Sequence, residues 1–238
     1  MLHTALHSRD KSGQLVIIVH GYFSSDKLGP ARLYVQIART LAGIGFDVLR
    51  FDFVGFGESD GLMDSVTLES ELEDAQIVIS QMEKSYQSGI ILIGHSFGSN
   101  ISILLAKRCP SILKIIAISP VCEKNSEYGY LNRDKLRELE QTGLVSRKGF
   151  LVNEKFMKAL NDAPGVGARN IKIPVTIIRG SEDEFYSSEG ANRMARNFPN
   201  SRLVEIKGGN HNFLDLGTRT KLLDIIVREL ESMHQRQR

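Results

Sequence analysis

Short, unbroken apolar runs alternate along the chain with longer stretches in which apolar residues recur every three or four positions. The short runs span residues 15–19, 48–51, 90–93, 113–119, 175–178 and 203–206. Such runs are typical of strands that are buried on both faces. The longer stretches are typical of amphipathic helices and span residues 33–44, 68–86, 101–108 and 222–230. Because a helix lies between consecutive strands throughout the first four, we expect right-handed crossovers and a mostly parallel central sheet flanked by helices, which is an α/β fold.

Residues 121–172 interrupt this alternation. They contain two amphipathic segments, Asp134–Thr142 and Asn153–Ala163, but no run that would form a strand of the core sheet. We therefore expect a core made of residues 1–120 and 173–238, with an insertion between the two parts. A chain of 238 residues suits one α/β domain with an insertion of this size.

A serine flanked by glycines directly follows the third apolar run, in the sequence Gly94-His95-Ser96-Phe97-Gly98. A helical stretch begins immediately after it. A G-x-S-x-G motif between a strand and a helix is the sequence context of a nucleophile elbow, a sharp turn that exposes the serine hydroxyl at the edge of a sheet. The two glycines remove side chains that would collide with the neighbouring strand and helix. We expect His95 to point away from the neighbours of Ser96.

With this elbow, the chain resembles the α/β-hydrolases. It is most similar to their lid-bearing esterases, namely monoglyceride lipases, bacterial cinnamoyl (feruloyl) esterases and serine aminopeptidase-like hydrolases. The resemblance runs from about Gln14 to the last helix and is weakest between Val121 and Lys172. It implies the α/β-hydrolase fold, in which an insertion such as residues 121–172 acts as a lid.

The resemblance also implies an acid and a base. The family places its acid after a late strand in a G-x-x-D pattern that matches Asp183, although Glu182 and Glu184 lie on either side. The last strand leads through two glycines to His211, which matches the family's base loop. Ser96, Asp183 and His211 therefore occur in the order that separates this fold from the other serine hydrolases.

Two further sets of residues follow from the resemblance. The family's H-G-x turn after the first apolar run supplies one backbone N–H of the oxyanion hole and matches Tyr22, while the second donor would be the N–H of Phe97. Aromatic residues near this turn and in the insertion are candidates for substrate binding, with ordinary packing as the alternative: Phe23, Tyr128, Tyr130, Phe150 and Phe156. The resemblance implies no metal and no cofactor.

Two turns near the start of the chain are expected to be structural. His20 would form hydrogen bonds beneath its loop, and Asp52 opens a turn, ending at Asp60, that resembles the family's D-x-x-G-x-G-x-S. We expect Asp52 and Asp60 to hold this loop and to have no catalytic role. Fewer than 15 residues precede the first apolar run. The family's N-terminal hairpin is therefore expected to be shortened or lost.

The predicted chemistry is acyl transfer to water. His211 would take the proton of Ser96, whose oxygen would attack an ester carbonyl. Aromatic residues in the insertion favour a small or medium-sized ester, aromatic esters included, over a long triglyceride. Two alternatives stay open: the same triad could act on a thioester, an amide or a peptide with a free N-terminus, or the chain could be a ligand-binding module on a hydrolase scaffold.

Composition and charge limit the partners and the cellular compartment that we expect for this protein. The 30 basic and 28 acidic residues give a net charge of +2 and are scattered, which does not indicate a nucleic-acid partner. Cys109 and Cys122 show no metal-binding spacing and fit reduced thiols. No apolar run reaches the roughly 18 residues of a membrane span, and the first residues lack the apolar core of a signal peptide. We expect a cytoplasmic enzyme for a small-molecule ester, and its oligomeric state, monomer or homodimer, stays open.

Overall fold

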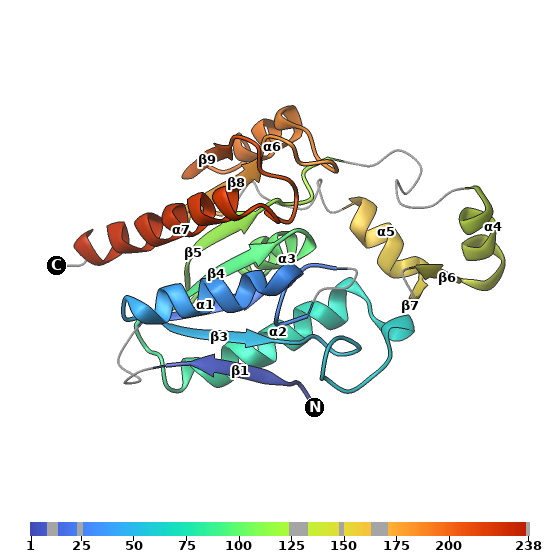
Figure 1. Ribbon diagram of the computed structural model, residues 1–238. Helices are drawn as coiled ribbons and strands as arrows, with labels where there is room; N and C mark the ends of the chain where they lie inside the picture. The colour runs from blue at the N-terminus through green and yellow to red at the C-terminus, as the bar shows by residue number, and fades with distance from the viewer. Residues whose placement is uncertain (9–13, 23–25, 124–132, 148–149, 163–170, 237–238) are drawn as a thin grey trace.

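The computed structural model describes residues 1–8, 14–22, 26–123, 133–147, 150–162 and 171–236. Within these ranges, seven strands form one sheet in the order β1-β3-β2-β4-β5-β8-β9 (Figure 1). The strands are β1 (Thr4–His7), β2 (Leu15–Val19), β3 (Asp47–Phe51), β4 (Ile90–His95), β5 (Ile112–Ile118), β8 (Val175–Gly180) and β9 (Ser201–Ile206). All neighbours from β3 to β9 pair in parallel, which confirms the predicted parallel sheet.

The edge strand β1 is the exception, since it pairs with β3 in the antiparallel direction, from Thr4 opposite Phe51 to His7 opposite Val48. The expected N-terminal hairpin is therefore shortened to one edge strand among the described residues and is not lost.

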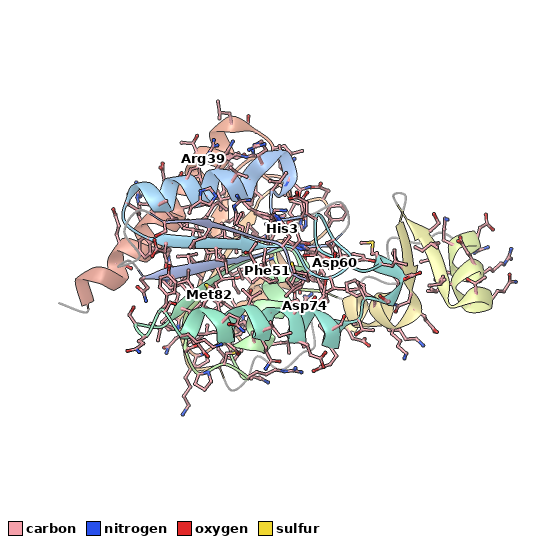
Figure 2. All side chains as sticks on the ribbon, turned by 90° about the horizontal axis from the view of Figure 1, so that it is seen from below. His3, Arg39, Phe51, Asp60, Asp74 and Met82 are labelled. Atoms are coloured by element: carbon pink, nitrogen blue, oxygen red, sulfur yellow. The ribbon has the colours of Figure 1, made fainter. Side chains whose placement is uncertain are left out.

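Helices cover both faces of the sheet. The helices are α1 (Leu33–Gly43), α2 (Leu68–Glu83), α3 (Phe97–Leu105), α6 (Ser188–Ala195) and α7 (Leu216–Arg236), and two 3-10 turns, η1 (Pro30–Arg32) and η2 (Met63–Ser65), precede α1 and α2. Apolar side chains of α1 and α7 join one buried cluster with one face of the strands, and those of α2, α3 and α6 join a second cluster on the other face. Figure 2, seen from below, shows α1 and α2 on opposite sides of the sheet.

No helix in the described ranges combines the length and the apolar character needed to cross a bilayer.

The order of the strands reverses at β2. The chain runs from β2 outward to β3 and then returns to β4 on the other side of β2. In open α/β sheets, ligands bind outside the carboxyl ends of the strands at such a reversal. The turn that contains Ser96 follows β4, at this reversal.

The described residues of the insertion form two helices and a hairpin: α4 (Arg133–Thr142), β6 (Leu144–Arg147), β7 (Phe150–Asn153) and α5 (Glu154–Asp162). The two predicted amphipathic segments form α4 and α5, whereas the hairpin was not predicted. Figure 1 shows all four elements beyond the carboxyl ends of the core strands. Their inward side chains join the apolar cluster of α2 and α3: Leu139, Val145, Val152, Phe156 and Met157.

Two asparagines connect the insertion to the core. The Asn153 side chain donates hydrogen bonds to the carbonyl oxygens of Asp64 (2.8 Å) and Val66 (2.6 Å), next to η2. Asn100, on α3, bonds the backbone of Val121 twice, because its Nδ2 donates to the carbonyl oxygen (3.0 Å) and its Oδ1 accepts from the N–H (3.1 Å). Residues at the start and in the middle of the insertion are thus fixed to the core.

Asp52 holds its loop, as expected. It is fully buried and accepts hydrogen bonds from the Lys27 ammonium (2.6 Å), the Lys27 N–H (2.6 Å) and the Glu58 N–H (2.9 Å). Burial alone raises the pKa of Asp52, but the hydrogen bonds from Glu58 and Lys27 outweigh it and lower the pKa below its ordinary value. The carboxylate is a charged anchor between the β3 turn and the Lys27 loop.

Glu71, on α2, has a buried carboxyl group with one unpaired oxygen in the described structure. Its side chain is 2% exposed, and Oε2 has no hydrogen-bond partner among the described residues. Burial, and then the neighbouring Asp74 (labelled in Figure 2), raise the pKa of Glu71 well above its ordinary value of 4.5. Deprotonation of Glu71 is therefore more costly in the folded than in the unfolded chain, and the cost appears only above that ordinary value and grows with pH.

We predict that Glu71→Gln changes the pH dependence of stability. The amide cannot ionise, so the variant escapes the penalty that the wild type incurs as the pH rises. The melting temperature of the variant minus that of the wild type should increase by a few degrees between about pH 4.5 and about pH 8, since about 1 kcal/mol corresponds to about 2–4 °C in a chain of this size. Melting curves at several pH values measure this difference, and a difference that stays constant would contradict the prediction.

Candidate active site

Ser96 lies at a sharp turn between β4 and α3. Its backbone has φ 53° and ψ −126°, and a positive φ is rare in residues other than glycine. The Ser96 N–H donates to the carbonyl oxygen of Ile118 at the end of β5, at 2.8 Å, which extends the sheet to the turn itself. This is the strand–turn–helix geometry that the motif predicts.

The glycines of the motif are required by close packing. A Cβ atom on Gly94 would lie 2.5 Å from the carbonyl oxygen of Gly98 and 2.5 Å from Cα of Ser99, inside the first turn of α3. A Cβ atom on Gly98 would collide with the carbonyl oxygens of Val19 and His20, where β2 ends. The expected collisions with the helix and the neighbouring strand are confirmed.

The structure brings Ser96, His211 and Asp183 together. Nε2 of His211 lies 3.0 Å from Oγ of Ser96, and Nδ1 lies 3.0 Å and 3.1 Å from the two carboxylate oxygens of Asp183. The three residues follow β4, β9 and β8 respectively, so each stands at the carboxyl end of its own parallel strand.

Asp183 is nearly inaccessible to water, with a side chain 1% exposed. Burial alone raises its pKa, but the hydrogen bond from His211, the charge of that residue and the N–H groups of Phe185 and Tyr186 outweigh burial and lower the pKa below its ordinary value. A charged carboxylate can only accept hydrogen bonds. Nδ1 of His211 is therefore the donor to Asp183, which leaves Nε2 of the neutral ring free to accept the Ser96 proton.

The neighbouring glutamates take other positions. Only Asp183 among the three acidic residues contacts the imidazole in the described structure, whereas Glu184 accepts a hydrogen bond from the backbone N–H of His211 at 3.1 Å. Sequence reasoning treated Glu184 as an alternative acid and missed this contact with the base loop, which depends on how the two loops meet.

The candidate oxyanion donors lie on either side of the turn. Phe97 is the first residue of α3, and the first N–H groups of a helix have no partner within the helix and carry partial positive charge. Tyr22 follows Gly21, whose added Cβ atom would lie 2.9 Å from the carbonyl oxygen of His95 and 3.0 Å from Cβ of Ser96. The loop after β2 therefore runs directly against the elbow.

One of the five candidate substrate-binding aromatics is close to the elbow. Phe156, on α5, is buried, with its ring centroid 4.2 Å from that of Tyr22 and 5.4 Å from that of Phe97. Helix α5 of the insertion thus packs on both candidate oxyanion residues. Phe150 belongs to β7, and its side chain lies outside the described part of the structure, as do the residues Phe23, Tyr128 and Tyr130.

Phe185 is a neighbour of the base that sequence reasoning missed. Its ring stands nearly perpendicular to that of His211, with centroids 4.9 Å apart, and the residue is 41% exposed. The ring of Tyr186 is 5.7 Å from that of His211. The only signal in the sequence was the position of both aromatics just after Asp183.

The expectations for the two histidines near the elbow had different outcomes. His20 has the expected structural role, since Nδ1 donates to the carbonyl oxygen of Gly21 at 2.7 Å and Nε2 accepts from the N–H of Phe53 at 3.2 Å. The expectation for His95 was wrong, because its Nε2 lies 3.1 Å from the carbonyl oxygen of His211. The base loop folds over the end of β4, and that contact is not visible in the sequence.

Three potential metal ligands, on His3, Asp52 and Glu58, lie close together in the described part of the chain. The Lys27 ammonium donates hydrogen bonds to both carboxylates. A cationic side chain therefore already occupies this cluster, and the residues do not fit a metal site.

Comparison with known proteins identifies the family of the chain. The sequence model of the family described as serine aminopeptidase, S33, matches residues 10–147, more than half of the chain. The chain belongs to this family of α/β-hydrolases. It is therefore a member of a hydrolase family, and its mostly parallel sheet flanked by helices is the fold of that family.

Several of the similar proteins are named as esterases or lipases. Human monoglyceride lipase is 33% identical over 97 residues, which cover 40% of this chain and 32% of the lipase. Est1E from Butyrivibrio proteoclasticus, solved with ferulic acid bound, is 22% identical with a TM-score of 0.79 and covers 99% of this chain and 95% of its own. The monoacylglycerol lipase of Paleococcus ferrophilus is 23% identical with a TM-score of 0.75, over 98% and 99% of the two chains. These solved structures share the fold.

We predict that Gly98→Ala destabilises the protein by about 1–3 kcal/mol, the usual cost of forcing an atom into a packed site. The added methyl group must displace the carbonyl oxygens at the end of β2. Gly43→Ala is the matched control, because a Cβ atom on Gly43 meets nothing within 4 Å. This control should leave the free energy of unfolding unchanged or raise it by up to about 1 kcal/mol. Denaturant titration measures both, and equal values for the two variants would contradict the packing argument.

Proposed function

We propose that the protein hydrolyses carboxylic esters of small or medium size, aromatic esters included, through an acyl-enzyme intermediate on Ser96. The observation that carries the proposal is the continuous contact from Ser96 Oγ to His211 Nε2 (3.0 Å) and from His211 Nδ1 to Asp183 (3.0 Å). A nucleophile, a base and a group that orients the base within hydrogen-bond reach of one another form the arrangement that activates a serine.

In the first half of the reaction, Nε2 of His211 takes the proton of Ser96 while Oγ forms a bond to the ester carbonyl carbon. The carbonyl oxygen becomes an oxyanion, which the N–H groups of Tyr22 and Phe97 stabilise by about 3–4 kcal/mol per donor. Asp183 keeps the imidazole in the required tautomer and stabilises its charged form. The C–O bond then breaks, and His211 gives its proton to the leaving alcohol.

In the second half, water replaces the alcohol. His211 takes a proton from the water molecule, whose oxygen attacks the acyl carbon. The second tetrahedral intermediate collapses, the bond to Ser96 breaks, and His211 returns the proton to Oγ. The buried carboxylate of Asp183 serves both halves, because the imidazolium that it stabilises forms twice.

The insertion would act as a lid that sets the substrate. Support comes from Phe156, whose ring packs against both candidate oxyanion residues, and from the backbone anchors at Asn100 and Asn153. Phe185, half-exposed beside His211, offers an aromatic surface to a substrate. A surface of this kind next to the base favours compact or aromatic esters.

Substitution of Ser96 or Asp183 should lower kcat strongly. Ser96→Ala should lower kcat by about 10⁶ and abolish labelling by a fluorophosphonate probe, and Asp183→Asn should lower kcat by about 10⁴ because the imidazole takes the wrong tautomer. Glu184→Gln is the matched control. Its amide oxygen can still accept from the His211 N–H, so kcat should stay within a few fold.

A panel of substrates measures these effects and separates the alternatives: p-nitrophenyl acetate, a feruloyl ester, a monoacylglycerol, an acyl thioester and an amino-acid p-nitroanilide. Preference for the anilide would instead support a peptidase. Covalent labelling of the wild type with no turnover on any substrate would favour a binding module. Ser96→Ala activity within tenfold of the wild type would exclude Ser96 as the nucleophile.

The proposed lid makes a separate prediction. Replacing residues 124–170 with a Gly/Ser linker keeps Val121 and its two bonds to Asn100. Turnover of p-nitrophenyl acetate should persist, whereas kcat/KM for the preferred bulky ester should fall by at least about tenfold, because remote contacts that orient this substrate are lost. Equal losses on both esters in a folded variant would mean that the insertion supports the catalytic frame and does not select the substrate.

A further inference from the structure

A chain of buried hydrogen bonds runs beneath the candidate triad. The hydroxyl of Tyr34, on α1, lies 2.8 Å from Nδ1 of His95, the last residue of β4, and Nε2 of His95 lies 3.1 Å from the carbonyl oxygen of His211. The N–H of Gly21 points to the Tyr34 oxygen at 3.4 Å. Tyr34 is fully buried and His95 is 3% exposed.

Donor and acceptor types fix the direction of each bond. A carbonyl oxygen can only accept, so Nε2 of His95 carries the proton. Burial, and then the neighbouring His211, lower the pKa of His95 to about 3, which keeps its ring neutral and makes Nδ1 an acceptor. Tyr34 must then donate to Nδ1, and its oxygen can accept from Gly21. The chain of bonds admits one arrangement of protons.

These contacts join three loops that the proposed mechanism uses. Gly21 precedes the candidate oxyanion donor Tyr22, His95 precedes Ser96, and His211 is the candidate base. We propose that Tyr34 and His95 are positioning residues, which hold the base loop and the oxyanion loop in register around Ser96. This inference rests on the proposed function for its kinetic consequences.

The surroundings argue against a role in packing alone. Tyr34 belongs to the apolar cluster between α1, α7 and the sheet, whose other members are aliphatic or phenylalanine side chains such as Leu33, Ile93 and Phe213. Burial of polar groups in such a cluster is unfavourable unless they are hydrogen-bonded, and apolar side chains of similar size would fill the same volume. The polar pair is therefore explained by what it bonds to, the backbone of two functional loops.

Two substitutions of His95 separate its two bonds. In His95→Gln, the longer amide can still donate to the carbonyl oxygen of His211, whereas in His95→Asn the shorter amide can accept from Tyr34 but cannot reach His211. We expect His95→Asn to lower kcat by about tenfold to a hundredfold with little change in KM, since small displacements of a base have effects of this size. His95→Gln should lose at most about threefold. Equal losses in the two variants would overturn the proposal.

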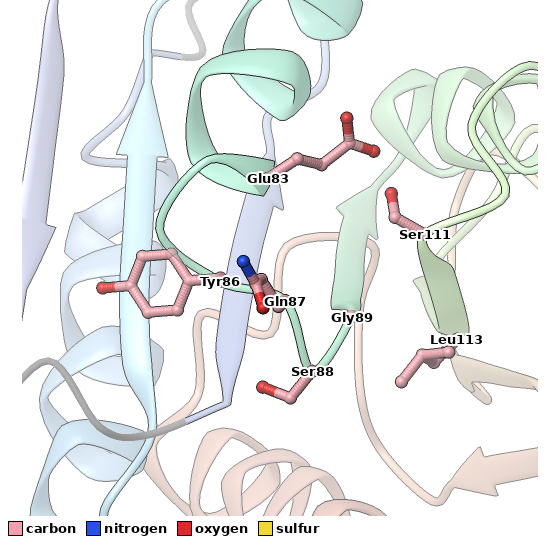
Figure 3. A pocket seen from close by; sticks show the side chains of 7 residues that line it. All are labelled: Glu83, Tyr86, Gln87, Ser88, Gly89, Ser111 and Leu113. Carbon is pink, nitrogen blue, oxygen red and sulfur yellow. The ribbon is translucent and has the colours of Figure 1, made fainter.

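Tyr34→Phe tests the other end of the chain, and Tyr86→Phe is its matched control. Tyr86 is also buried and donates to Asp47 at 2.9 Å, but it lines a shallow hollow at the opposite, amino-terminal edge of the sheet (Figure 3). Both variants lose one buried hydroxyl and should lower the melting temperature similarly. Only Tyr34→Phe should lower kcat, by about tenfold, because it loses the contact from the Gly21 N–H in the oxyanion loop as well as the bond to His95. A loss of kcat in Tyr86→Phe as large as in Tyr34→Phe would mean that the effect is one of general stability.

A readout without turnover keeps the test independent of the proposed reaction. Proton NMR follows the low-field resonance of the His211 Nδ1–H bound to Asp183, and hydrogen exchange follows the Gly21 amide. The His211 resonance should change in His95→Asn, which loses the bond to the His211 carbonyl oxygen, and the Gly21 exchange rate should change in Tyr34→Phe, which loses the Tyr34 oxygen. Both signals should stay as in the wild type in Tyr86→Phe. A wild type that hydrolyses no substrate would refute the proposed function while these signals still test the positioning role. Unchanged signals in His95→Asn and Tyr34→Phe would overturn that role.

Discussion

The backbone turn at Ser96 is the constraint on which the rest of the site depends. A positive φ at a residue that is not glycine is unfavourable and persists only where its surroundings fix it. Here the Ser96 N–H bonds the end of β5, and Gly98 lies against the end of β2, so strands on both sides of β4 hold the turn. The three strands are central and buried, so a strained turn is held by well-packed neighbours.

Burial and hydrogen bonding set the protonation states of the titratable groups around this turn. Asp183 stays charged although it is buried, because three N–H donors surround it. His95 stays neutral because it is buried and its partners demand that tautomer. Two buried titratable groups that both contact His211 thus hold different charge states, since Asp183 is charged and His95 is neutral. Their hydrogen-bond partners decide the difference.

Local sequence patterns predict much of this organisation. Short unbroken apolar runs are typical of strands buried on both faces, so the parallel core strands were predictable, as were α4 and α5 from their amphipathic spacing. The G-x-S-x-G motif predicted the elbow, because only glycine leaves room for the chain on either side of the serine. The order of Ser96, Asp183 and His211 predicted which residues to look for at the edge of the sheet.

Only the tertiary structure shows the contacts between loops that are far apart in the sequence. Without the resemblance, the sequence could not show which of Glu182, Asp183 and Glu184 is the acid, because a shift of one position along a turn changes the direction of the side chain. Only the folded chain places Asp183 beside the His211 imidazole and Glu184 beside the His211 backbone N–H. The hairpin β6–β7 was missed because strands this short carry too few residues for a period to appear. The contact from Tyr34 through His95 to His211 spans residues far apart in the chain, and distances of that kind are set by packing of the whole core.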